Sequence, residues 1–573
     1  MFRRGTSPPQ PARRRTAAAI VVALLGATAA ATAAGATSPP TGPDTSVPGT
    51  EAPATDAPGT DVPGTDAPGT DAPGSEAPGS DAPSSSAPAA TDAPGTAAPE
   101  APAATLPADI DTEGTAAIGI VLEPTNLDIV HQAGAALEQL LLDNVYETLL
   151  TGAPDGTTSP GLASLEISED GLTYTFTLPE GVTFHDGDPL TASDVVATLE
   201  ETKANGVNKE DFSSVETIEA PDDLTVVLTL SQPDSELAFN LSRRGGVVLN
   251  EGATDVETSA NGTGPFTLAE WSQGSSITLE RNDDYWGEPA NVAEVVFQFY
   301  PEPNALVNAL SDGDIDIAVA VNTDLIGEFE DNPDWVITSG PSNGEFTLGY
   351  NNGGEVLSDQ RVRQAITQAI DKAGVQALFN GYGTIVGAPV PPFDPWYEDL
   401  TGLYPYDPDA ARALLEEAGY GDGLTLSFVV PNHYPQSIAD YVVSQLGDVG
   451  ITVDLQLVEF PTWLEQVYTN HDYDLTAVLH VEPRDIFNYG NPDYYWQYNN
   501  PEVIALLDQS RLEVDVDASN ELRRQAAAII AEDAATNVLI VYDDVIVANT
   551  RIYGYPTFDA NSRFDVTGVA VTS

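Results

Sequence analysis

Hydrophobic and polar residues alternate along much of the chain between residues 115 and 300. After a short apolar strand at 115–123, this alternation predicts two-stranded pairs, because successive side chains of a strand face opposite sides. The predicted pairs are 173–178 with 183–184, 216–218 with 225–230, and 266–271 with 276–281. A helix is predicted over 137–150, where Leu137, Leu140, Leu141, Val145 and Leu149 recur at helical spacing. This half is expected to be antiparallel sheet with a few helices.

The pattern changes after residue 350. A long amphipathic helix is predicted over 359–379, and Asp407 is expected to cap a second helix over 408–418 that ends at Gly419. Strands and helices then alternate, which predicts a parallel sheet covered by helices. The strands are 424–430, 451–459 and 474–480, with helices 437–446 and 462–468 between them; helices 501–512 and 519–532 and a strand pair, 538–542 with 545–549, follow.

Ligands of open parallel sheets bind beyond the carboxyl ends of the strands. The residues that leave those ends are therefore candidates for a ligand site. They are Asn432, His433 and Tyr434 after the first strand, Phe460 after the second, and 481–485 after the third.

The N-terminal region has a composition unlike the rest. Arg3, Arg4 and Arg13 to Arg15 precede an apolar, Ala-rich stretch with small-residue cleavage patterns, which indicates an export signal over 1–36. A retained membrane helix is the alternative. Residues 37–107 repeat a Thr-Asp-Ala-Pro-Gly pentad with almost nothing apolar larger than valine, so we expect a disordered linker or stalk.

The charge and the missing residue types exclude several classes of function. The 573 residues include 88 acidic and 20 basic side chains, a net charge of −68, and no cysteine. Phosphate binding needs basic surface, so a nucleic-acid binder is excluded, and disulfides, thiolate nucleophiles and Cys-held metals are impossible. The acidity fits either a solvated surface suited to salty surroundings or the attraction of cationic ligands.

Catalytic and cofactor motifs are missing as well. Gly262-Thr263-Gly264 is followed by Pro265, so it lacks the third glycine and the helix of a dinucleotide loop. His471 and His480 flank one predicted strand and form only a weak metal pair, and His185 fits a turn. We expect neither an enzyme nor a cofactor or metal site.

Several segments occur in the order typical of one family. They are DNVYETL at 143–149, PGLA at 160–163, EDGLTYTFTL at 169–178, GVTFHDG at 181–187, LTASDV at 190–195, GTGPF at 262–266, RNDDYWG at 281–287, RVRQAI at 361–366 and DAARALLEEAGY at 409–420. This set resembles the extracytoplasmic solute-binding proteins of family 5, the peptide- and nickel-type receptors of ABC importers. The resemblance spans roughly residues 115–550.

The resemblance implies an α/β, two-lobed fold like the type II periplasmic binding proteins, with mixed sheets around a ligand cleft and an extra subdomain. Mapped onto this chain, the implied parts are lobe I at 108–150, 262–345 and 545–573, its inserted subdomain at 151–261, and lobe II at 346–544. The implied function is to capture a solute, a peptide before others, and deliver it to an ABC permease and ATPase complex as an exported monomer. Receptors for a nickel complex, haem or sugar, and a signalling protein of the same fold, are the alternatives.

The resemblance also implies where a ligand sits. In peptide-binding relatives, an aspartate in the loop after the strand equivalent to 474–480 pairs with the α-ammonium of the ligand, and Asp485 occupies that place, although the flanking residues depart from the family pattern. The alternative for Asp485 is a loop cap, and for each aromatic residue nearby it is ordinary packing. The full set of expected ligand-site residues is Tyr350, Asn351, Trp396, His433, Trp463, His480, Arg484, Asp485, Tyr494 and Trp496.

Overall fold

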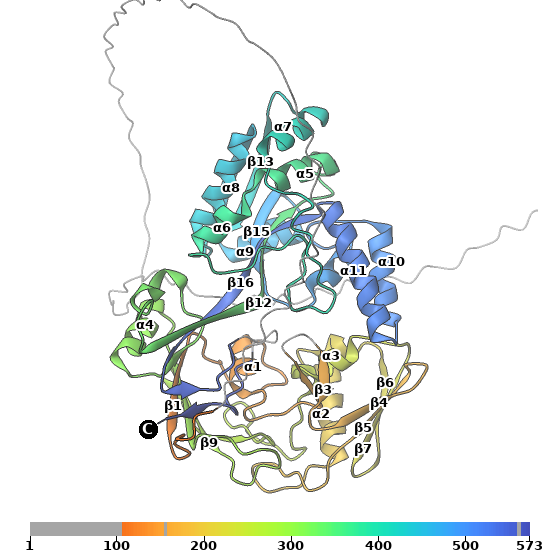
Figure 1. The fold of residues 1–573 in the computed structure, drawn as a ribbon. Helices are drawn as coiled ribbons and strands as arrows, with labels where there is room; N and C mark the ends of the chain where they lie inside the picture. Colours follow the sequence, from red (N-terminus) through yellow and green to blue (C-terminus); the bar gives the residue numbers. More distant parts are fainter. Residues whose placement is uncertain (1–105, 154–156, 558–562, 573) are drawn as a thin grey trace, which may run out of the picture. The chain divides into compact units, whose positions relative to one another are not determined.

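A ten-stranded mixed sheet dominates the described part of the computed structural model, which covers residues 106–153, 157–557 and 563–572 (Figure 1). Its strand order is β14-β13-β15-β12-β16-β11-β1-β10-β9-β8. The strands are β1 (Thr115–Ile120), β8 (Phe266–Ser272), β9 (Ser276–Arg281), β10 (Glu294–Phe299), β11 (Ile317–Ala318), β12 (Trp335–Tyr350), β13 (Leu424–Pro431), β14 (Ile451–Val458), β15 (Leu475–His480) and β16 (Thr536–Asn549). The sheet therefore joins strands from both halves of the sequence.

Two long antiparallel strands, β12 and β16, hold this sheet together. One end of β16 pairs with β11, while the far end of β12 pairs with β15. The expected strand pair at 538–542 and 545–549 is wrong, because these residues form the single strand β16. The Asp543-Asp544 step has no glycine or asparagine to make a tight turn, so the backbone stays extended opposite Gly340 and Pro341.

The parallel part of the sheet is confirmed. Strand β13 pairs parallel with both β14 and β15, and α8 (Gln436–Asp448) connects β13 to β14. The connection from β14 to β15 is α9 (Phe460–Trp463) continued by a π-helical turn over Leu464–Thr469. One hydrophobic core packs these strands against α5 (Gln360–Ala369), α6 (Lys372–Leu378), α7 (Pro408–Glu417) and α8.

A separate antiparallel sheet with its own hydrophobic core lies between residues 149 and 248. Its described strands run in the order β4 (Ser164–Ile167), β5 (Thr173–Thr177), β7 (Thr225–Leu230) and β6 (Val215–Asp222). Pairing of β6 with β7 is as expected, and so is pairing of β8 with β9. The expected partner of 173–178 is wrong: β5 pairs with β4 and β7, and Thr183 instead bridges Pro189.

Two helix predictions fail where polar side chains compete with the helix. The helix expected over 137–150 ends at Leu141, because Asp143 adopts φ +65° and the buried Asn144 amide donates to the Leu140 and Phe564 carbonyls. The helix expected over 359–379 splits into α5 and α6, because Ile370 is extended and the Asp371 carboxylate caps α6 through the Ala373 N–H. The spacing of apolar residues alone does not predict the end of α1 or the separation of α5 from α6.

The remaining described helices and short strands complete the fold. Asp407 caps α7 as expected, through the N–H groups of Asp409 and Ala410. The helices are α1 (Ala135–Leu141), α2 (Ala192–Asn205), α3 (Leu237–Leu241), α4 (Pro303–Asp312), α5 (Gln360–Ala369), α6 (Lys372–Leu378), α7 (Pro408–Glu417), α10 (Pro501–Leu512) and α11 (Val516–Glu532), and the short strands are β2 (Leu150–Gly152), β3 (Thr158–Pro160), β17 (Ile552–Tyr553) and β18 (Ala570–Val571).

All described residues fall in one compact unit, and its α/β architecture with mixed sheets is that of the two-lobed fold. The expected signal at 1–36, and the expected linker apart from its last two residues, lie outside the described residues. Among the helices that are described, none combines the length and the apolar character needed to cross a bilayer.

Candidate functional site

The carboxyl end of β15 brings the first predicted site residues together. His480 is the last residue of β15 and pairs in register with Glu345 of β12, so the two side chains share one face of the sheet. The His480 Nδ1 atom lies 2.7 Å from an Asp485 carboxylate oxygen, and its Nε2 atom lies 2.8 Å from the Tyr495 hydroxyl. Asp485 also accepts a 2.7 Å hydrogen bond from Asn488. The loop after β15 is thus folded back onto the strand end.

Three carboxylates, Glu345, Asp394 and Asp485, form what we call the acidic cluster. Glu345 is 4% exposed, and its Oε1 atom has no hydrogen-bond partner among the described residues. Burial raises the pKa of Glu345 well above its ordinary value, and the nearby Asp485 and Asp394 charges raise it further. Burial also raises the pKa of Asp394 to about 7, although Arg484 and Arg523 oppose the shift. Lys372 near Glu345 and the two arginines near Asp394 only partly offset these shifts, and Asp485 lies against His480.

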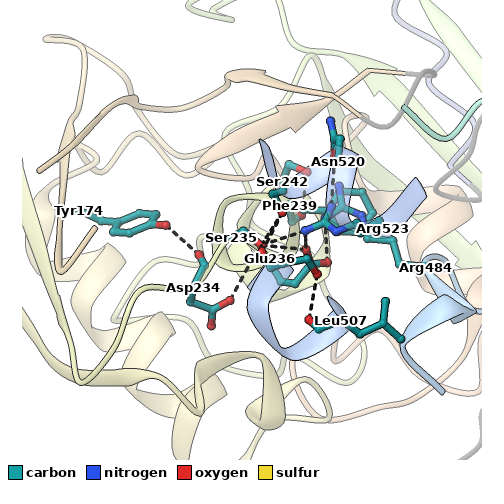
Figure 2. Close-up of polar contacts among 12 residues, drawn as sticks. Tyr174, Asp234, Ser235, Glu236, Phe239, Ser242, Arg484, Leu507, Asn520 and Arg523 are labelled. Atoms are coloured by element: carbon teal, nitrogen blue, oxygen red, sulfur yellow. Dashed lines mark hydrogen bonds and ion pairs between the residues drawn. The ribbon is translucent and has the colours of Figure 1, made fainter. Parts of the chain in front are cut away.

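A second group of buried charges, the arginine contact, consists of Glu236, Arg484 and Arg523 (Figure 2). Glu236 precedes α3 in the four-stranded subdomain, whereas Arg484 follows β15 and Arg523 lies on α11. The two carboxylate oxygens of Glu236 are ion-paired separately, one with Arg523 and the other with Arg484 at 2.7 Å. Burial disfavours ionised Glu236, but the two arginines outweigh it and hold the pKa below its ordinary value.

Aromatic rings and backbone hydrogen bonds reinforce the arginine contact. The Arg484 guanidinium stacks 3.5 Å from the Phe239 ring centre and 5.3 Å from that of Trp396, and Arg523 lies 4.9 Å from Trp396. Next to Glu236, the Ser235 N–H donates to the Arg511 carbonyl at 2.8 Å. Arg484 itself has φ +60°, a conformation uncommon outside glycine. The contact therefore joins the subdomain to the second half of the chain through several bonds.

Most of the predicted aromatic residues line the same region but are buried. Trp496 stacks on Tyr489 at 4.6 Å and lies 5.2 Å from His480, and Tyr494 lies 4.5 Å from Trp496. Trp463 donates from its indole N–H to the Thr476 hydroxyl at 2.8 Å. Trp396, Trp463 and Trp496 are each at most 2% exposed. In this conformation the rings pack on one another around the end of β15.

The other predicted residues occupy different places. His433 follows β13 and packs against Tyr434 and Phe460, where burial lowers its pKa. Tyr350 lies five residues along β12 from Glu345, about 17 Å at the usual rise per residue of a strand. Its buried hydroxyl contacts Thr367, and the Asn351 amide donates to the carbonyls of His471 and Tyr473. Tyr350 and Asn351 are thus not brought together with Asp485.

Sequence reasoning missed Glu236, Glu345, Asp394 and Arg523. Glu345 had a detectable signal, because it is the one charged residue of β12, and charged residues are rarely buried unless they are paired. Glu236 and Arg523 had none, since their pairing joins positions almost 300 residues apart. Within the described chain, no group of three or more His, Asp or Glu side chains could hold a metal ion.

Comparisons with known proteins agree with this architecture. The family model for bacterial extracellular solute-binding proteins, family 5 (middle region), matches residues 157–501. Protein XP55 of Streptomyces lividans is 29% identical over 486 residues, covering 77% of this chain and 86% of the relative. The oligopeptide-binding protein AppA of Bacillus subtilis is 27% identical and covers 77% of this chain and 89% of its own length. The crystal structure of the ABC transporter substrate-binding protein CtaP of Listeria monocytogenes has a TM-score of 0.73, with 24% identity, and covers 81% of this chain and 100% of its own.

Proposed function

Because the chain belongs to family 5 of the bacterial extracellular solute-binding proteins, we propose that it is a peptide receptor of an ABC importer. It captures the peptide between its two lobes and passes it unaltered to a membrane permease. Lobe I comprises 108–150, 262–345 and 545–573, the inserted subdomain 151–261, and lobe II 346–544. Closing the lobes excludes water, so affinity comes from non-covalent contacts.

The observation that carries this proposal is the acidic cluster beside a dense group of aromatic rings. A carboxylate that is largely removed from water is stabilised by an incoming ammonium group far more than a surface carboxylate would be. Asp485 is the receiving group because it lies in the loop after β15, and His480, whose Nδ1 atom lies 2.7 Å from it, holds the carboxylate in place. Glu345 contributes a second buried carboxyl group on the same sheet face as His480. Named relatives such as the oligopeptide-binding protein AppA support the choice of a peptide.

The remaining predicted residues have supporting roles in this proposal. Arg484 and Trp396 lie where the subdomain meets lobe II, so they are placed to respond to lobe closure. Trp463, Tyr494 and Trp496 provide apolar contact area next to the ammonium position. The receptor is exported and works at the cell envelope, in accord with the extracellular family to which it belongs.

The test is calorimetric titration with short peptides that carry either a free or an acetylated N-terminus. Asp485→Ala is expected to weaken binding of the free-amine peptide more than tenfold, about 1.4 kcal/mol, and to leave the acetylated peptide unaffected. Asp493→Ala is the matched control, because Asp493 is an exposed aspartate of the following loop. Unchanged affinity in Asp485→Ala would remove this residue from the site. Binding of nickel chelates or glycans in place of peptides would overturn the choice of ligand.

A further inference from the structure

A cavity of about 160 Å³ lies in the second half of the chain, and none of the three residues of the acidic cluster lines it. Its walls come from the start of β16, the junction of α5 and α6, and the segment 385–406. Apolar side chains such as Ile370, Val386 and Leu400 form part of the lining. The polar lining includes Lys372 and Asn537. An apolar cavity of about this volume holds one benzene-sized molecule, so there is room for a small organic ligand.

The buried amide of Asn537 is the first indication that the cavity binds a ligand. Its side chain is 2% exposed, and neither its amide nitrogen nor its amide oxygen has hydrogen-bonding geometry with any described residue. The Tyr350 hydroxyl interacts with this amide, which partly offsets the rise that burial causes in the pKa of Tyr350, but this hydroxyl already contacts Thr367 at 3.1 Å. Buried amides are almost always hydrogen-bonded, and one hydroxyl does not satisfy both amide atoms, so the remaining donor or acceptor calls for a partner inside the cavity.

Lys372 supplies the charge. Its ammonium donates one hydrogen bond, to the Val386 carbonyl at 2.8 Å, and no ion pair joins it to a carboxylate within the described residues. The adjacent Asp371 carboxylate is already engaged with the Ala373 N–H. Burial lowers the pKa of Lys372 to about 8, and Glu345, the acid that opposes this shift, itself has a raised pKa. The ammonium therefore has N–H donors that no described residue accepts, and neither of the two acids near it, Glu345 and the cavity-lining Asp371, forms an ion pair with it.

We propose that this cavity binds a small organic monocarboxylate, held by the Lys372 ammonium and the Asn537 amide. One carboxylate oxygen pairs with Lys372, the Asn537 amide nitrogen donates to the carboxylate, and the hydrocarbon part fills the apolar side of the cavity. A neutral molecule of the same shape would leave the ammonium unpaired, and an amine would repel it.

A ligand in the cavity would also stabilise the position of the segment 385–406. The same segment carries Asp394 of the acidic cluster and Trp396, against which both arginines of the arginine contact stack. The inference does not depend on which solute the acidic cluster receives.

Calorimetry on the full chain tests the proposal with benzoate and propionate as probes. Benzyl alcohol, benzamide and benzylamine serve as neutral and cationic matches of benzoate. We expect saturable binding of at least one carboxylate and at least tenfold weaker binding of the three matches. No saturable binding of either carboxylate, or equal binding of benzyl alcohol, would overturn the proposal in favour of a water-filled cavity.

Variants and NMR make the test specific to the two residues. Lys372→Met and Asn537→Leu are expected to weaken the carboxylate at least tenfold, whereas Lys209→Met, at an exposed lysine, leaves it unchanged. The chain has three lysines, Lys203, Lys209 and Lys372, so lysine-labelled wild-type protein gives a readout that requires no variant. Benzoate is expected to move one Nζ signal and to raise its titration midpoint above pH 8. A shift of Lys203 or Lys209 in place of Lys372 would contradict the assignment.

Discussion

The arginine contact and the acidic cluster are both buried, both charged and close to each other, yet they are built in opposite ways. In the arginine contact, each carboxylate oxygen of Glu236 is ion-paired with a guanidinium, and the rings of Phe239 and Trp396 flank the cations. In the acidic cluster, Glu345 keeps an unpartnered oxygen, and the pKa of both Glu345 and Asp394 is raised by burial.

The difference separates a structural role from a binding role. A buried charge that the chain itself neutralises makes the arrangement of the fold more specific, because it holds two parts of the chain in one relative position. A buried charge that the chain leaves uncompensated lowers the stability of the folded state and becomes favourable when a ligand supplies the opposite charge. By this criterion, we assign the arginine contact to the architecture and propose the acidic cluster for ligand binding.

The largest effect is expected from Glu236→Gln, which removes the carboxylate that Arg484 and Arg523 share. We expect a loss of about 3 kcal/mol in the free energy of unfolding, measured by chemical denaturation at pH 7. Because the pKa of Glu236 is held below its ordinary 4.5, this stabilisation is present above pH 4.5 and is lost as the pH falls through the lowered value. The difference from wild type should therefore vanish in acid. Glu219→Gln, at an exposed position of β6, is the matched control.

Asp394→Asn is expected to raise the free energy of unfolding at pH 8, by about 2 kcal/mol, which is the opposite of the effect at Glu236. The pKa of Asp394 is raised from 3.8 to about 7, so folded wild type holds a proton that the unfolded chain has lost, and its stability falls as the pH rises from about 4 to 7. The variant should be more stable than wild type at pH 8 and similar at pH 4. A variant that is less stable than wild type at pH 8 would mean that the neighbouring arginines neutralise the Asp394 charge in the folded protein. Glu398→Gln, at an exposed site nearby, is the control.

Replacing the whole arginine contact by apolar residues sharpens the comparison. The triple change Glu236→Leu, Arg484→Met and Arg523→Met removes all three charges together, and no unpaired ion remains. Its unfolding free energy is expected within about 1 kcal/mol of wild type, a smaller loss than for Glu236→Gln alone. If the triple variant is less stable than Glu236→Gln, the three ions contribute net stability in addition to fixing the arrangement of the chain.

The smallest effect is expected at an exposed ion pair. Asp409 pairs with Arg412 on α7, but its side chain is 95% exposed, so solvent and salt screen the interaction. Asp409→Asn should leave the denaturation midpoint unchanged within error. A measurable loss would mean that exposure is not what separates this pair from the arginine contact.

Local patterns in the sequence were sufficient for much of the fold. The alternation of strands and helices from 424 to 480 predicted the parallel pairing of β13 with β14 and β15, because each element buries a face that its own periodicity reveals. Predictions failed where one side chain or a distant strand decided the outcome, as with Asn144 at the end of α1 and the long strand β16 opposite β12. Apolar spacing does not carry that information.

The sequence by itself determined the family, the order of the elements and the candidate loop after β15, because each depends on short-range patterns and ordered motifs. Only the tertiary structure decided which polar groups meet: Glu236 with arginines 248 and 287 residues away, Glu345 opposite His480 across the sheet, and Lys372 with Asn537 around one cavity. The physical reason is that a charge acts over a few ångströms of space and takes no account of separation along the chain.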